Sequence, residues 1–71
     1  MIKMGSKVRW KWRNGFARGK VKEVFHRIVS KTINGSKVIM NGSKDCPVFL
    51  IKKEGESSEI LLLQSDVQEL A

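Results

Sequence analysis

The sequence predicts an all-β fold, a small five-stranded barrel with a short helical turn near its C-terminus. Three observations predict it: segments of alternating polar and apolar residues are typical of half-buried strands, Asn-Gly pairs are typical of tight turns, and 71 residues have room for one domain. We expect residues 1–71 to form that single domain, with its core in residues 6–70.

The first predicted strand spans residues 7–13, where polar and apolar residues alternate without exception. Neighbouring side chains of a strand point to opposite faces, so three apolar residues share one face and four basic residues share the other. The apolar face carries Val8, Trp10 and Trp12, and the basic face carries Lys7, Arg9, Lys11 and Arg13. Asn14-Gly15 then predicts a turn.

Residues 18–29 predict a long, bent second strand, and β-rich composition continues to residue 33. The alternation weakens at residues 23–25, which indicates a bulge that bends the strand. Asn34-Gly35 predicts a hairpin between residues 31–33 and 36–38, since both central positions of a type I′ turn need positive φ.

The remaining elements follow from shorter signals. Residues 41–47 predict a loop, and strands are expected at residues 48–52 and 59–63. Ser65 and Gln68 have the spacing of a capping box, which predicts a short helical turn before Ala71. About five short strands joined by tight turns favour an SH3-like barrel over a sandwich.

The charge is high and unevenly distributed. The formal net charge is +7, residues 1–53 hold all 14 basic residues, and residues 54–71 hold five of the seven acidic ones. A basic body is typical of proteins with an anionic partner, with nucleic acid the first candidate. Charge that serves only solubility stays an open alternative.

The candidate nucleic-acid site is the set of basic side chains that project from one face of the first two strands. If these strands pair as an antiparallel hairpin, the two basic rows form one patch that contacts phosphates without reading sequence. The predicted residues are Lys7, Arg9, Lys11, Arg13, Arg18, Lys20 and Lys22.

Aromatic side chains provide the alternative site. Trp12 and Phe16 flank the first turn, where we expect partial exposure, and Trp10 or Trp12 should belong to the core. An exposed ring would stack a base or dock a peptide, so a protein- or peptide-interaction module is the alternative function. The positive charge disfavours cationic methyl-lysine tails as ligands.

Other chemistry is not predicted. His26 and Cys46 are isolated and lack metal-ligand spacing, so we expect no metal, no cofactor, no catalytic residue and no enzyme activity. A single cysteine excludes an internal disulfide, and no apolar run has the length of a signal peptide or a membrane span. We expect a cytoplasmic monomer without membrane association, with self-association through an edge strand as an open alternative.

The sequence resembles the hypervirulence-associated Tudor-like family of short bacterial and fungal proteins, over residues 7–70. The resemblance is carried by Val8-x-Trp10-x-Trp12, Gly15, Gly19-Lys20-Val21-x-Glu23-Val24, Asn34-Gly35, Asn41-Gly42-Ser43-x-Asp45-x-Pro47-x-Phe49-x-Ile51 and Leu63-x-Ser65-Asp66-Val67-x-Glu69-Leu70. It implies a Tudor-type SH3-like barrel that binds without catalysis or cofactor. Tudor relatives bind methylated lysine or arginine, and similar barrels bind nucleic acid or protein. The chain departs from the family at the Arg13-Asn14 turn, which is usually richer in glycine, at Phe16, where a smaller residue is usual, and in its more basic character.

Overall fold

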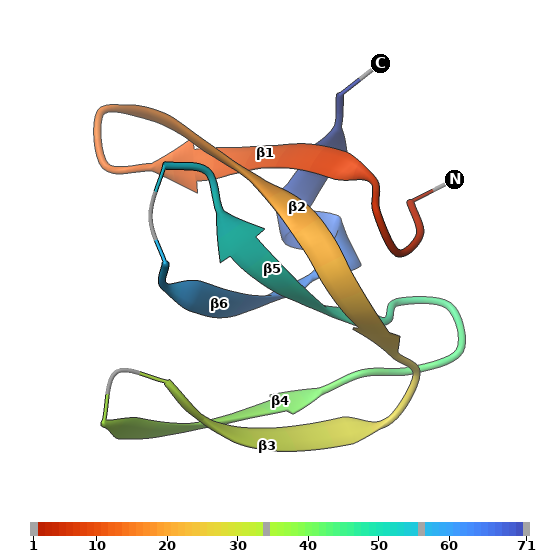
Figure 1. Cartoon of the computed structure of the whole chain (residues 1–71). Helices are drawn as coiled ribbons and strands as arrows, with labels where there is room; N and C mark the ends of the chain where they lie inside the picture. Colours follow the sequence, from red (N-terminus) through yellow and green to blue (C-terminus); the bar gives the residue numbers. More distant parts are fainter. Residues whose placement is uncertain (1, 34, 56, 71) are drawn as a thin grey trace.

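The structure, a computed structural model, describes residues 2–33, 35–55 and 57–70. These residues form seven strands and one 3-10 turn, drawn in Figure 1. In chain order they are β1 Lys7–Trp12, β2 Gly15–Phe25, β3 Ile28–Ile33, β4 Ser36–Asn41, β5 Val48–Lys53, β6 Glu59–Leu63, the turn η1 Gln64–Asp66 and β7 Val67–Glu69.

The strands form one antiparallel five-stranded sheet and one separate hairpin. The sheet has the order β6-β5-β2-β1-β7, and β3 pairs with β4 (Figure 1). This confirms the all-β fold, its five-stranded sheet and a helical turn near the C-terminus. The pairing recorded in the described part of the chain does not join β6 to β7, so the barrel is not closed. Residues 36–38, expected as a barrel strand, pair with β3 in the separate hairpin, and β7 supplies the fifth strand of the sheet.

The second strand is long and bent, as predicted, but it ends at Phe25 and not at residue 29, because residues 28–33 form β3 of the separate hairpin. It pairs with β1 over residues 15–20 and with β5 over residues 19–25, so it belongs to both halves of the sheet. The pairing with β5 shifts register between Val21 and Glu23, slightly before the position that the sequence pattern indicated for the bulge. The bulge turns the later part of the strand relative to the earlier part.

The β3–β4 hairpin is confirmed by its register, in which Ile33 lies opposite Ser36 across a two-residue turn. Gly35 has a φ of 79°, a conformation that glycine adopts without steric cost. Asn34, the other turn residue of the prediction, lies outside the described residues.

The strand β5 separates two apolar clusters, because its successive side chains point to opposite faces. Phe49 and Ile51 pack in a cluster with residues of β1, β2 and β7. Val48 and Leu50 pack in a second cluster with residues of the β3–β4 hairpin and of β6. The hairpin therefore covers part of the outer face of the sheet, and the rest of that face carries mostly basic side chains.

The C-terminal segment differs from the capping-box prediction, which is wrong. The 3-10 turn has Leu63 at its N-cap without a side-chain hydrogen bond, and Ser65 lies within the turn. Val67 then pairs with Trp10 and is buried in the first cluster. Burial of this apolar side chain and its backbone pairing with β1 outweigh the weak local preference for a helix.

Candidate functional site

Three lysines from neighbouring strands lie directly opposite one another on the outer face of the sheet. Lys7 of β1 pairs with Lys20 of β2, and Lys20 pairs with Lys52 of β5. One step along the same strands, Arg9 pairs with Arg18. We call the five residues Lys7, Arg9, Arg18, Lys20 and Lys52 the basic face. Directly opposed like charges destabilise a sheet, so this arrangement is costly to folding.

The basic face is the part of the outer sheet face that the hairpin leaves uncovered. Leu50 lies two residues before Lys52 on the same face of β5, and it is buried beneath the hairpin. Lys7, Arg18, Lys20 and Lys52 are exposed, and Arg9 is half-buried. The cations are therefore held on a rigid sheet whose other face is the apolar core.

Lys22 lies at the bulge and is engaged by an acid. Its Nζ donates a hydrogen bond of 2.6 Å to Glu59 Oε2 of β6. This hydrogen bond raises the pKa of Lys22 above 10.5, and donation by Lys22 lowers the pKa of Glu59 below 4.5. Lys22 is therefore the cation that forms the ion pair with Glu59, and Lys52 of the basic face lies directly opposite the same Glu59 in the β5–β6 pairing.

The Lys22–Glu59 ion pair makes stability depend on pH in acid. Because the folded-state pKa of Glu59 is lowered, its contribution to stability is present above 4.5 and is lost as the pH falls through the folded value. We expect Glu59→Gln to lower the melting temperature slightly at neutral pH, and to leave it unchanged once the pH is below the lowered folded-state pKa of Glu59. Thermal unfolding followed by circular dichroism at both pH values measures this, with Asp45→Asn as the control. An equal loss at both pH values would contradict it.

The other two predicted cations lie towards the tip of the β1–β2 hairpin. Lys11 is exposed and lies opposite Phe16, beyond the Arg9–Arg18 pair. Arg13 lies in the turn with a φ of 53°, and its guanidinium carbon is 5.6 Å from the centre of the Trp12 ring. Lys11 thus extends the basic face, whereas Arg13 is directed to the indole.

Trp10 lies in the core and Trp12 does not, although the alternation of β1 places both on the same face. Trp10 is only 3% exposed, while Trp12 is 42% and Phe16 58% exposed. Trp12 lies opposite Gly15, and Phe16 lies opposite Lys11, so the two exposed rings point to opposite faces of the hairpin. Phe16 shares the outer face with the basic residues, and Trp12 does not.

Cations of the chain itself lie over both exposed rings. The Arg9 guanidinium carbon is 4.6 Å from the centre of the Phe16 ring, and Lys53 Nζ is 4.4 Å from the centre of the Trp12 ring. These distances are those of cation–π contacts. A cation of the chain thus already lies over each exposed ring, which is unfavourable for a second cation.

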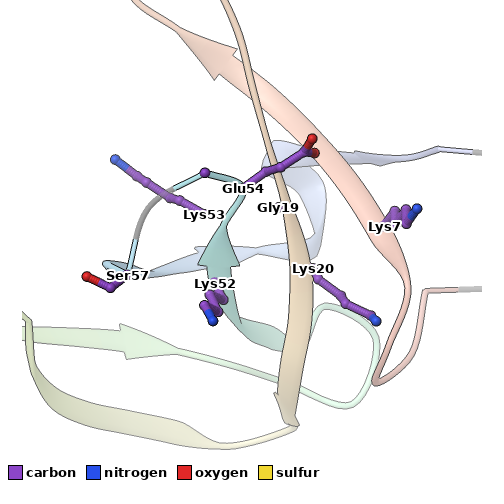
Figure 2. A pocket seen from close by; sticks show the side chains of 8 residues that line it. Lys7, Gly19, Lys20, Lys52, Lys53, Glu54 and Ser57 are labelled. Atoms are coloured by element: carbon purple, nitrogen blue, oxygen red, sulfur yellow. The ribbon is translucent and has the colours of Figure 1, made fainter.

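Two grooves adjoin the basic face at the end of β5. The first, of about 570 Å³, is lined by Lys7, Lys20 and Lys52 together with the β5–β6 connection. Figure 2 shows these lysines on three neighbouring strands, with Lys53 pointing the other way. The second, of about 520 Å³, lies between Trp12, Phe16 and the same connection. Glu54 lines both grooves.

Lys52, Lys53 and Glu54 are site residues that the sequence analysis did not identify. The pairing that brings Lys52 beside Lys20 joins segments about thirty residues apart, and no local pattern specifies it. The available signal was the change from the apolar run at residues 48–51 to two lysines and a glutamate. That change marks the point at which β5 leaves the core.

Metal and membrane chemistry have no counterpart in the described residues. Within residues 2–33, 35–55 and 57–70, no group of three His, Cys, Asp or Glu side chains is placed to hold a metal ion. The same residues contain no helix with the length and apolar character needed to cross a membrane. Cys46 is half-buried, and its Sγ lies 3.9 Å from Ser65 Oγ.

Comparison with known proteins gives one family. Residues 5–67 match the sequence model described as hypervirulence associated proteins TUDOR domain. No curated protein and no solved structure matches the chain. The matched segment includes the sheet strands β1, β2, β5 and β6, and therefore the whole basic face.

Proposed function

Since the chain belongs to the family of hypervirulence-associated TUDOR domains, a family of small binding modules, we propose that it is a non-enzymatic module that binds the phosphate backbone of nucleic acid. The observation that supports this proposal is the row Lys7–Lys20–Lys52, in which like charges lie directly opposite one another. Such a row destabilises the free protein and is relieved by an anionic ligand.

The spacing of the basic face suits a backbone of repeated phosphates. Adjacent strands are about 4.8 Å apart, and same-face residues along a strand are about 6.7 Å apart. The Lys7–Lys20–Lys52 row and the Arg9–Arg18 pair thus form two successive levels of positive charge, comparable in spacing to the phosphates of an extended strand. Phosphate contacts of this kind fix the position of a nucleic acid without selecting its sequence.

A salt titration tests the proposal. For about five phosphate contacts on a single strand, the slope of log K against log salt is about −3.5, so affinity falls about 100-fold between about 50 and 200 mM salt. Fluorescence anisotropy with labelled, mixed-sequence DNA and RNA oligonucleotides measures both quantities. Absence of binding at low salt would refute the proposal, and so would an affinity that is insensitive to salt.

A protein- or peptide-binding module is the second candidate, favoured by the groove between Trp12 and Phe16. Glu54 lines this groove, and an acid beside aromatic rings suits a methylated lysine. Three observations disfavour a cationic ligand: the rings point to opposite faces, Arg9 and Lys53 already lie over them, and the basic face adjoins the groove.

Glu54→Gln distinguishes an anionic ligand from a cationic one. Removal of this carboxylate should tighten oligonucleotide binding about 1.4- to fivefold, because an exposed charge pair contributes about 0.2–1 kcal/mol. The same change would weaken binding of a trimethyl-lysine peptide. Anisotropy titrations with both probes compare the two. Weaker oligonucleotide binding by Glu54→Gln would contradict the proposed site, and Asp45→Asn serves as the control for loss of one negative charge elsewhere.

A further inference from the structure

The geometry points to single-stranded nucleic acid as the ligand, and to Phe16 as the residue on which one base stacks. This inference rests on the proposed function, because it takes the basic face as the phosphate-binding surface. It adds a site for a base and a preference for unpaired strands. Neither follows from the positive charge, which attracts single strands and duplexes alike.

Phe16 lies one step beyond the basic face along the same strands. The outer face of β1 and β2 presents Lys7 opposite Lys20, then Arg9 opposite Arg18, then Lys11 opposite Phe16. Each step is about 6.7 Å along the strand. A backbone that contacts the first two levels therefore brings the base of the next nucleotide to the level of the Phe16 ring.

The space beside Phe16 is open because β2 extends past the end of β5. Residues 15–18 pair with β1 on one edge, and the β2–β5 register begins at Gly19. The Glu54 N–H donates a hydrogen bond of 2.9 Å to the Arg18 carbonyl, which extends the backbone contact between the two segments by one residue, as far as Arg18. Among the described residues, no strand pairs with β2 beside Phe16 on that edge.

The Phe16 ring is held in a position that suits stacking. Arg9 Nε donates a hydrogen bond of 2.9 Å to Gln68 Oε1 of β7, and this bond orients the guanidinium that lies over the ring. The ring nevertheless stays 58% exposed. The guanidinium covers one face of the ring, so a base would stack on the other face while the phosphates meet the neighbouring cations, the combination that single-strand binders use.

A duplex cannot use this ring, because its bases are already stacked and paired with one another. The phosphates of a duplex reach the lysines and arginines, but no base is free to contact Phe16. The inference thus predicts that truncation of Phe16 affects single strands and leaves duplex binding unchanged. Trp12 provides the matched comparison, since it is also exposed but points to the other face of the hairpin.

The test compares Phe16→Ala, Phe16→Trp and Trp12→Ala with the wild type. Each is titrated by anisotropy against a labelled single-stranded oligonucleotide and against the duplex of the same length. We expect the wild type to prefer the single strand, and Phe16→Ala to lose about tenfold in single-strand affinity with less than a twofold change for the duplex. Phe16→Trp should restore or improve single-strand binding, and Trp12→Ala should change neither affinity more than about twofold.

The outcomes separate this inference from the proposed function. If the wild type binds neither probe, the proposed function fails. If it binds both, but Phe16→Ala affects them equally or Trp12→Ala has the larger effect, the phosphate-binding face stands and the stacking role of Phe16 is refuted. Thermal unfolding of each variant confirms folding, and Phe16→Trp keeps the test decisive if Phe16→Ala unfolds.

Discussion

The double variant Lys7→Gln/Lys20→Gln should bind a single-stranded oligonucleotide about tenfold more weakly at physiological salt, because each lost phosphate contact removes about 0.7 from the salt slope. The slope itself should become shallower by about 1.4. These two side chains lie directly opposite one another, so their replacement also removes a repulsion. The free energy of unfolding should therefore stay unchanged or rise by about 0.2–1 kcal/mol.

The matched control is Lys37→Gln/Lys44→Gln, which lowers the net charge by the same amount. Lys37 is exposed on the hairpin and Lys44 is exposed in the β4–β5 connection, and neither belongs to the basic face. We expect the control to keep most of the affinity and the slope. Equal losses in the two variants would mean that net charge, and not the arrangement on the sheet, determines binding. Titrations in salt and urea unfolding curves provide the two measurements.

Gly19→Ala should destabilise the fold by about 2 kcal/mol, the range expected when extra atoms are forced into a packed core. A Cβ at this position would lie 2.6 Å from Ile51 Cγ2, 2.6 Å from the Lys52 carbonyl oxygen and 3.2 Å from Trp10 Cη2. The Lys52 carbonyl belongs to the backbone of the adjacent strand and moves only if β2 and β5 separate. For a domain of this size the loss is a large part of a total stability of about 4–10 kcal/mol.

Urea unfolding at equilibrium measures this effect, with a fall in the midpoint of about 1–2 M expected for a small domain. Gly15→Ala is the matched control, because a Cβ there meets nothing within 4 Å. We expect that variant to be neutral or slightly more stable, since alanine restricts the unfolded chain. An unchanged midpoint in Gly19→Ala would show that β2 and β5 are not packed as described. Gly19 lies between Arg18 and Lys20, so the close packing it permits also supports the basic face.

The sequence predicts the first two strands of the site well, because local alternation determines which side chains share a face. Strict alternation in residues 7–12 places the basic residues on one face and the apolar ones on the other, and the structure has this arrangement. The pairing of Arg9 with Arg18 and of Lys7 with Lys20 then follows from the short turn between the strands. A local turn sets a local register, so this part of the site is predictable.

The long-range part of the site is not predictable from local patterns. Lys52 joins the basic face through the pairing of β5 with β2, whose register depends on the packing of Phe49 and Ile51 in the core. Glu59 lies opposite Lys52 in the β5–β6 pairing, and Lys52 lies opposite Lys20 in the β5–β2 pairing, so these two long-range registers bring Glu59 to Lys22. The sequence indicates a bulge in this strand but does not specify these registers.

The C-terminal segment shows how tertiary pairing overrides a short local signal. The spacing of Ser65 and Gln68 is that of a helix start, but the segment is too short for a stable helix. Val67 instead enters the core opposite Trp10, and Gln68 lies beside Arg9 as its hydrogen-bond acceptor. The residue expected to cap a helix therefore orients a cation of the basic face.

The most direct test of the central claim, that nucleic acid binds the basic face, is an amide chemical-shift titration with a short single-stranded oligonucleotide. We expect the largest shifts at the amides of Lys7, Arg9, Arg18, Lys20 and Lys52, and we expect these shifts to disappear at high salt. Shifts confined to the β3–β4 hairpin, none of whose residues belongs to the basic face, would contradict it. The absence of any shift at low salt would contradict it equally.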